Sequence, residues 1–133
     1  MQEINVSVVI LYDGPLMLVN LRPEGTYFSG WWEWPGGKQQ EGETSLDCAV
    51  RELQEEIGLY QPDLSEYAIE CVEYPGRKIR LRFFVGRRPP GDAAADALEH
   101  RWVEPGEVLS MRFLEPNLPV LQRLIADPPF RDD

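Results

Sequence analysis

The chain has 133 residues, of which 43% are hydrophobic, so it is long enough to form one domain with a substantial core. Its formal net charge of -10 argues against a stable nucleic-acid partner or an anionic membrane surface, because phosphate groups attract the opposite sign. The sequence contains no signal peptide and no apolar run of membrane-spanning length. Cys48 and Cys71 lie in apolar stretches and form no disulfide or metal-binding framework. We therefore expect a cytoplasmic protein whose two cysteines are reduced core thiols.

The first forty residues favour β-structure. Residues 4–11 and 16–21 are β-rich runs on either side of the turn sequence Tyr12-Asp13-Gly14-Pro15, which predicts a hairpin. Residues 23–30 read as a loop with Tyr27 and Phe28 at its tip. Residues 31–37 then predict a short strand that leads into a helix.

Residues 44–58 have the pattern of a helix with two different faces. Apolar side chains recur at three- and four-residue steps at Leu46, Ala49, Val50, Leu53 and Ile57. Three carboxylates cluster on the far side of the same helix, at Glu52, Glu55 and Glu56. Thr44 is positioned to cap the start, with Asp47 as the second member of a shortened capping box, and Gly58 predicts the end.

The three carboxylates have two interpretations. Like charges on adjacent turns repel each other, and a divalent cation such as Mg²⁺ would reverse the sign of that interaction. The competing interpretation is an acidic face that simply contacts solvent, which is the commoner outcome for a generic helix of this composition.

The second half of the chain predicts a further hairpin and a final helix. Residues 66–74 and 78–86 flank Pro75-Gly76, which is typical of a type II turn. Residues 87–96 are expected to be the least ordered stretch, and residues 101–104 a last short strand. Residues 116–126 carry a helical stripe of Leu118, Leu121, Leu124 and Ile125. We expect one domain over residues 1–133, with a polar tail that frays over residues 128–133.

Residues 37–59 resemble the Nudix hydrolase signature G-x5-E-x7-R-E-U-x-E-E-x-G-U, in which U is a bulky aliphatic residue. Every specified position is filled, by Gly37, Glu43, Arg51, Glu52, Leu53, Glu55, Glu56, Gly58 and Leu59. The resemblance implies an α+β fold in which a mixed β-sheet is sandwiched between helices (an α/β/α sandwich). It also implies a loop-helix-loop segment that holds Mg²⁺, with Mn²⁺ as a possible substitute.

The resemblance also implies a set of site residues. Metal ligands would be Gly36, Glu52, Glu55 and Glu56, with one more carboxylate from the loop before the last strand. Asp96 and Glu99 compete for that role, and we favour Glu99. Arg51 is expected beside the catalytic carboxylates, with Glu43 as its partner, since metal sites need groups that hold the ligands in place. Either Glu52 is a metal ligand or it is the base that takes a proton from water.

A narrower similarity, to the MutT branch of the family, extends over nearly the whole chain through residues 32–38, 70–85 and 117–120. That branch cleaves nucleoside triphosphates to monophosphate and pyrophosphate, and its type member prefers 8-oxo-dGTP. It implies substrate-binding roles for Arg22, Glu33, Trp34, Gly37, Lys38, Arg77 and Asn117. Structural alternatives remain open: a solvated Arg22, a turn charge at Arg77, a core Trp34, a Lys38 that offsets the acidic helix, and an Asn117 that caps the final helix.

These observations favour a Mg²⁺-dependent nucleoside triphosphate pyrophosphohydrolase that uses metal-activated water, as a monomer or weak dimer. Two alternatives stay open. One is hydrolysis of another nucleoside-diphosphate derivative such as ADP-ribose, and the other is a non-catalytic nucleotide-binding module. A cytosine-containing triphosphate is a further candidate substrate, because the choice of base rests on Asn117 alone.

Overall fold

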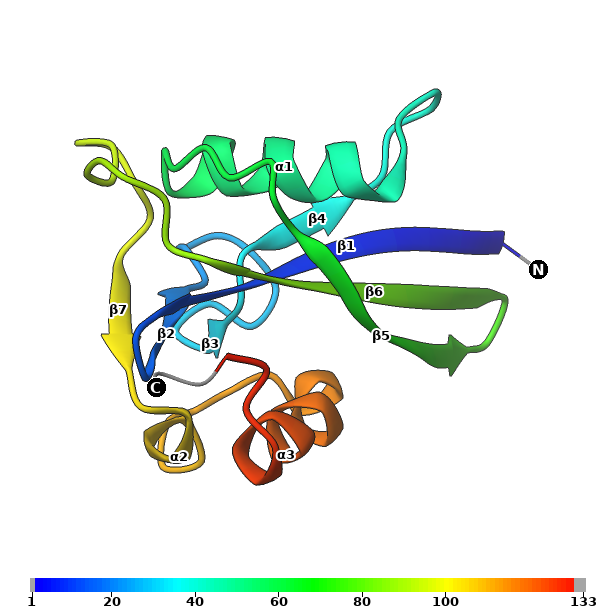
Figure 1. The fold of residues 1–133 in the computed structure, drawn as a ribbon. Coiled ribbons are helices and arrows are strands. Elements are labelled where there is room, and N and C mark those ends of the chain that lie inside the picture. Colours follow the sequence, from blue (N-terminus) through cyan, green and yellow to red (C-terminus); the bar gives the residue numbers. More distant parts are fainter. Residues whose placement is uncertain (1, 131–133) are drawn as a thin grey trace.

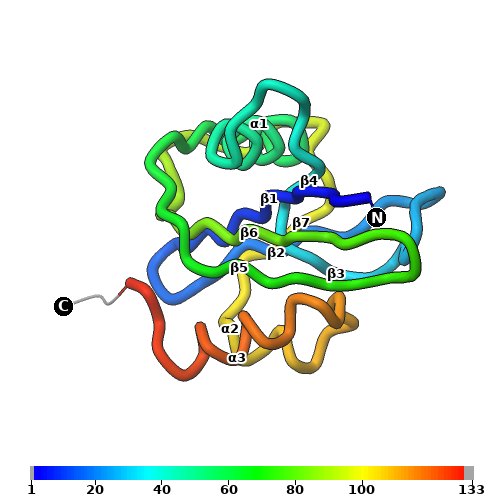
Figure 2. Tube along the Cα trace, turned by 90° about the vertical axis from the view of Figure 1, so that its right-hand side faces the viewer, coloured from blue at the N-terminus to red at the C-terminus, as the bar shows by residue number. Residues whose placement is uncertain are grey.

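The computed structural model describes residues 2–130, and within them one mixed sheet lies between two helical layers. Helix α1 covers one face of the sheet, and α2 and α3 cover the other (Figures 1 and 2). The expected α+β sandwich is therefore confirmed. No helix of residues 2–130 is long and apolar enough to span a membrane.

The elements follow one another along the chain with short connections. The strands are β1 Gln2–Asp13, β2 Leu16–Leu21, β3 Trp32–Glu33, β4 Gly36–Lys38, β5 Ser65–Tyr74, β6 Arg77–Arg87 and β7 His100–Val103. The helical segments are α1 Ser45–Glu56, α2 Pro105–Val108, the 3₁₀ turn η1 Glu115–Asn117 and α3 Leu118–Ala126. Both predicted hairpins are present, and Gly76 has a φ of 81°, as the third position of a type II turn requires.

Strand β1 is the centre of the sheet. It pairs in parallel with β6 over its whole length, from Gln2 opposite Arg77 to Tyr12 opposite Arg87. On its other side, β2 pairs with the end of β1, and β4 pairs with the stretch from Val6 to Val8. Residues 31–37 are therefore two strands and not the single strand that we expected. Strand β3 pairs with β2 and β4 with β1, so the intervening Trp34-Pro35 carries the chain from one neighbour to the other.

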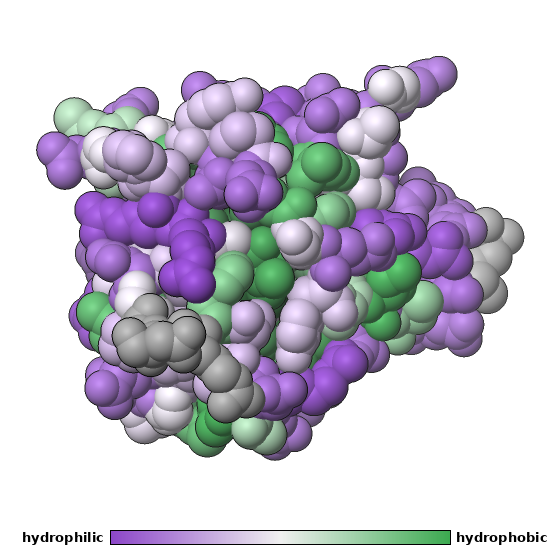
Figure 3. All heavy atoms as spheres, in the orientation of Figure 1, coloured by the Kyte–Doolittle hydropathy of each residue, from purple (hydrophilic) through white to green (hydrophobic). Residues whose placement is uncertain are grey.

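Alternation along β1 divides the core into two layers. Val8, Ile10 and Tyr12 face α2 and α3, whereas Val9 and Leu11 face α1. Trp34 and Phe83 belong to the first layer, and Leu53 and Phe84 to the second. Apolar side chains reach the surface in the middle of the face seen in Figure 3, surrounded by hydrophilic ones.

Helix α1 begins and ends as the sequence predicts. The Thr44 side chain accepts a hydrogen bond from the Asp47 amide, and Gly58, with φ 84°, follows the last turn. The buried face follows most of the predicted stripe, since Ala49, Leu53 and Ile57 are buried and Val50 is partly buried. It differs at two positions, because Cys48 is also buried and Leu46 is 37% exposed. Strand β4 lies along the carboxylate flank of the helix, so that flank is against the sheet and not opposite it.

Two smaller expectations are also corrected. Cys71 is exposed and not a core thiol, because β5 is an edge strand of the sheet and Cys71 points away from the core. The start of the tail, residues 128–130, is not simply frayed: the Phe130 ring contacts Tyr12 edge-on at 5.7 Å, and Arg87 stacks on its face. Residues 131–133 of the predicted tail lie outside the described part of the chain.

Two glycines with nearly equal φ provide a test of the packing of α1. Gly25 (φ 85°) has open space around it, whereas a Cβ on Gly58 (φ 84°) would overlap with Ala94. We expect Gly25→Ala to lower the free energy of unfolding by about 1–2 kcal/mol, the typical strain of a left-handed alanine. Gly58→Ala should lower it clearly further, as measured by urea titration. Equal losses of unfolding free energy in the two variants would show that the loop around Ala94 moves aside without an energetic cost.

Candidate active site

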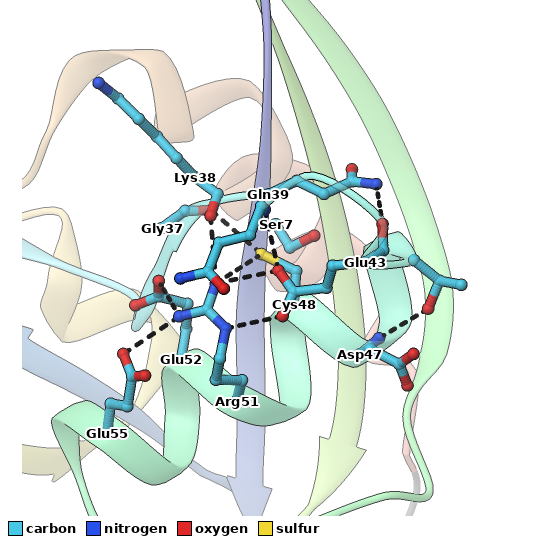
Figure 4. Close-up of polar contacts among 12 residues, drawn as sticks. Ser7, Gly37, Lys38, Gln39, Glu43, Asp47, Cys48, Arg51, Glu52 and Glu55 are labelled. Atoms are coloured by element: carbon cyan, nitrogen blue, oxygen red, sulfur yellow. Dashed lines mark hydrogen bonds and ion pairs between the residues drawn. The ribbon is translucent and has the colours of Figure 1, made fainter.

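One guanidinium group organises the carboxylates of α1 (Figure 4). Arg51 binds both oxygens of Glu43, through Nε at 2.7 Å and Nη2 at 3.0 Å. Its Nη1 donates to Glu52 at 2.9 Å and to Glu55 at 3.1 Å. Hydrogen bonds from Arg51, together with the Gln40 amide, lower the pKa of Glu43 to about 2. The expected pairing of Arg51 with Glu43 is thus present, and it anchors the loop before α1 to the middle of the helix.

Strand β4 lies directly against this flank of α1. The amide of Gly36 donates to Glu56 Oε1 at 2.8 Å. A Cβ on Gly37 would overlap with the carboxylate of Glu52, so only glycine leaves room for that side chain. The side chain of Glu52 is only 15% exposed, whereas that of Glu55 is 58% exposed. The interpretation of a fully solvated acidic face is therefore wrong for Glu52 and Glu56.

A further carboxylate, that of Glu33 on β3, lies near Glu56. Its Oε1 accepts from Arg22 at 3.0 Å, and its Oε2 lies 3.4 Å from Nδ2 of Asn20. Burial raises the pKa of Glu33 above its ordinary value, against the opposing effects of Arg22 and Asn20. Asn20 is itself fully buried, and its Oδ1 has no hydrogen-bond partner among the described residues. Sequence reasoning missed Asn20. A single asparagine in a strand gives no sign of a functional role until its neighbour on the adjacent strand β3, Glu33, is known.

A pocket extends from these carboxylates toward α3. It has a volume of about 200 Å³, and it is called the base pocket below after the base-binding roles that the MutT resemblance implies for Trp34 and Asn117. Its polar end is formed by Arg22, Glu33, Gly36 and Gly37. Its other end is apolar except for Asn117, and its lining there is Val72, Tyr74, Ile79, Leu81, Leu114 and Pro116.

The predicted substrate residues fall into two groups. Arg22, Glu33, Trp34, Gly37 and Asn117 all line the base pocket. Arg77 and Lys38 do not. Arg77 stacks on Tyr74 at the hairpin tip, with 5.1 Å between its Cζ and the ring centre, and the Lys38 side chain points away from the carboxylates in Figure 4.

Two of the structural alternatives can now be judged. Asn117 makes no side-chain capping bond and is 7% exposed, so the capping role is wrong. Trp34 is 2% exposed and packs edge-on against Phe83 and Phe113, so it is mainly a core residue that also forms part of the pocket wall.

The loop before β7 lies at the end of α1 that carries Glu55 and Glu56. Its backbone bonds to the last turn, from Leu98 N to the carbonyl oxygen of Glu56 at 2.9 Å. The carbonyl of Glu99 accepts from Leu21 N at 2.8 Å, beside Arg22, while its side chain is exposed. Asp96 is also exposed and lies in the turn between Ala94 and Leu98. The choice of Glu99 remains a prediction, and its backbone position next to β2 supports it.

The donor set fits a hard divalent cation. No three acidic, histidine or cysteine side chains of residues 2–130 are already gathered at metal-binding spacing. However, the side chains of Glu33, Glu52 and Glu56 are largely withdrawn from solvent and carry like charges, with the bare backbone of Gly36 and Gly37 beside them. Arg51 now supplies the positive charge on one side of this cluster. Oxygen ligands in such a cluster suit Mg²⁺.

The protonation of Glu56 tests whether burial and the neighbouring carboxylates disfavour its charged form. Burial, then the charges of Glu33 and Glu52, raise the pKa of Glu56 to about 8, against the opposing effect of the Gly36 amide. An acid with a raised folded pKa binds more protons when folded, so the stability that it contributes is complete below its unfolded pKa and is lost as pH rises through about 8.

We therefore expect metal-free Glu56→Gln to match the wild type near pH 4 and to be more stable at pH 9. The upper limit is about 1.4 kcal/mol per pKa unit. Urea titrations in EDTA measure the difference. A pH-independent difference for Glu56→Gln would contradict the buried-charge account.

Comparison with known proteins agrees with this geometry. A family model described as NUDIX domain matches residues 1–124. The chain is similar to CTP pyrophosphohydrolase of Escherichia coli strain K12, with 32% identity over 125 residues that cover 91% of this chain and 90% of that protein. It is also similar to 8-oxo-dGTP diphosphatase of the same organism, with 29% identity over 131 residues, or 93% and 98% of the two chains.

A solved structure supports the same assignment. The MutT structure from a study of the Aliivibrio salmonicida and Vibrio cholerae proteins has a TM-score of 0.77 and 25% identity, and the match covers 93% of this chain and 97% of that one. The family model thus spans nearly the whole chain, and it includes the helix whose carboxylates face β4. The chain belongs to the Nudix hydrolase family, as a MutT-like enzyme that acts on pyrophosphate bonds.

Proposed function

We propose that this enzyme hydrolyses (deoxy)nucleoside triphosphates to the monophosphate and pyrophosphate, with Mg²⁺ as its metal and Mn²⁺ as a substitute. Free nucleotides would be its substrates, since a net charge of -10 disfavours contact with a polymer of phosphates. The proposal includes action as a monomer or weak dimer in the cytoplasm.

The observation that carries this proposal is the polarity of the base pocket. One end adjoins partly buried carboxylates and contains the guanidinium of Arg22, and the other end is apolar with a single buried amide, Asn117. A nucleotide has the same polarity, with charged phosphates at one end and a flat base with hydrogen-bonding edges at the other. Pockets of this kind bind by apolar contact and orient their ligand with a few polar groups.

The residues at the polar end of the base pocket would have different roles. Glu52, Glu55 and Glu56 would hold the metal together with the Gly36 backbone, and Glu99 would add a further carboxylate. When bound, Mg²⁺ neutralises phosphate oxygens and orients the attacking water. Arg22 is placed to bind a phosphate group, for which it would exchange its bond to Glu33. Arg51 keeps Glu52 and Glu55 aligned along one side of α1.

The non-catalytic alternative is disfavoured, because a pure binding module has no need for buried like charges that weaken the fold. ADP-ribose remains the rival substrate. Among triphosphates, the similarity to a CTP pyrophosphohydrolase and to 8-oxo-dGTP diphosphatases makes cytosine and oxidised guanine the two bases to compare first.

A substrate panel tests the proposal directly. We expect Mg²⁺-dependent release of pyrophosphate from at least one of 8-oxo-dGTP, dGTP, CTP and dCTP, and weaker or no turnover of ADP-ribose and diadenosine polyphosphates. Glu55→Gln should lower kcat by at least about 100-fold while the unfolding transition is kept, since its exposed side chain contributes little to the core. A best substrate that is not a triphosphate would refute the assignment, and an unchanged kcat in the variant would refute the metal role of Glu55.

Asn117 provides a second test, of base recognition. Because its amide is buried in the base pocket and makes no capping bond, we expect Asn117→Ala to change the ratio of kcat/KM between the best and second-best bases by about tenfold or more. Asn117→Asp is a second variant for comparison, since it keeps the size of the side chain but replaces the amide donor with a carboxylate oxygen. An equal loss on every base would show that Asn117 has only a structural role.

A further inference from the structure

A second pocket adjoins the base pocket. It has a volume of about 350 Å³ and is lined by Phe28, Trp31, Tyr74, Leu114, Glu115 and Pro116. We call it the aromatic pocket. Phe28 and Trp31 meet edge-on, with 6.3 Å between ring centres, and Tyr74 contributes a third ring from the end of β5. No residue of the signature helix lines it.

The two pockets share Tyr74, Leu114 and Pro116. The residues of the base pocket that lie against α1, namely Gly36 and Gly37, are not shared. The aromatic pocket therefore adjoins the apolar end of the base pocket and not its polar end. A substituent carried by a base that lies beside Asn117 is the group placed to reach it.

The backbone is strained at Phe28, one of the residues that line this pocket. Phe28 has a φ of 58°, a conformation that bulky side chains rarely adopt. The loop holds it there with a hydrogen bond from Trp31 N to the carbonyl of Phe28 at 3.0 Å, and with one from Arg22 Nε to the carbonyl of Tyr27 at 2.6 Å. The ring is nevertheless 63% exposed, so burial in the core does not explain the strain.

The lining of the aromatic pocket is mainly aromatic and apolar, with Glu115 as its charged residue. The guanidinium groups of Arg77 and Arg112 stack on the rings of Tyr74 and Trp31, so charge alone does not select the occupant. The three rings attract an apolar or aromatic group. The base pocket alone, at about 200 Å³, is smaller than the typical ligand pocket of about 300–1,000 Å³, whereas the two pockets together fall within that range.

We propose that the aromatic pocket is a second subsite, which takes an aromatic or apolar substituent carried by the nucleobase. The enzyme would then act best on nucleotides whose base bears a bulky group, with the base beside Asn117 and the substituent between Phe28, Trp31 and Tyr74. This inference rests on the proposed function for the identity of the base pocket, but its test does not require turnover.

The experiment compares binding of nucleoside monophosphates with and without a benzyl group on the exocyclic amine. Isothermal titration calorimetry of AMP, CMP and GMP and their N-benzyl derivatives is carried out in EDTA. We expect the benzyl group to lower Kd by about tenfold or more for at least one base, since a tenfold change corresponds to only about 1.4 kcal/mol and a buried ring exceeds that. Phe28→Ala and Trp31→Ala should each remove most of this gain and leave the Kd of the unsubstituted nucleotide within about twofold.

Tyr27→Ala is the matched control. Tyr27 is adjacent to Phe28 and 88% exposed, and it does not line the aromatic pocket, so its loss should not alter the gain. The inference is overturned if no benzyl derivative binds more tightly than its parent. It is also overturned if Phe28→Ala weakens parent and derivative equally, because the base itself would then occupy the aromatic pocket. Pyrophosphate release from triphosphates without any benzyl gain would retain the proposed function and reject the subsite alone.

Discussion

The absence of side chains at Gly36 and Gly37 is the constraint on which this site depends. At Gly36 it lets β4 lie against the β1 backbone at Ser7 and Val8, with the Gly36 amide bonded to Glu56. At Gly37 it leaves room for the carboxylate of Glu52, so the carboxylate flank of α1 can lie against β4. The helix still buries Ala49, Leu53 and Ile57 of its apolar stripe, and Leu46 is the member that is exposed. The same packing places Glu52 and Glu56 near Glu33. The fold thus combines a buried apolar face with negative charge concentrated along one flank of the helix.

Concentrated charge has to be held in position, and Arg51 does this. Its five donors reach Glu43, Glu52 and Glu55 together, which a lysine with a single ammonium group cannot do in the same geometry. Glu43 accepts two of these bonds and belongs to the loop, so the loop, the helix and the carboxylates of Glu52 and Glu55 form one connected unit. Glu56 lies outside that network and accepts a hydrogen bond from the Gly36 amide. Burial, and then the charges of Glu33 and Glu52, outweigh that bond, raise the pKa of Glu56 and disfavour its charged form when no cation is present.

Sequence reasoning reached the local features and missed those that depend on pairing between distant segments. The cap at Thr44, the end at Gly58 and the turn at Gly76 were predictable, because each is determined by a few adjacent residues. The full length of β1 was not, since its first residues are polar and become a strand only beside β6. Likewise, Asn20 meets Glu33 only across the β2–β3 pair. Asn117 looked like a helix cap because Pro116 precedes it, but the 3₁₀ turn that begins at Glu115 starts the helical segment earlier and leaves the amide free for the pocket.

The site therefore separates two demands that conflict in a single pocket. Under the proposed function, catalysis needs closely spaced charges, which would come from α1 supported by β4 within the sandwich. Base recognition would fall to the start of α3 and the β5–β6 hairpin, and the loop of residues 23–30 would contribute only to the proposed subsite for a base substituent. Arg22 joins the carboxylate cluster to that loop, since it binds Glu33 through Nη1 and the loop carbonyl of Tyr27 through Nε. A phosphate that attracted Arg22 away from Glu33 would also act on the loop, so the proposed phosphate end and the aromatic pocket would be coupled through this guanidinium.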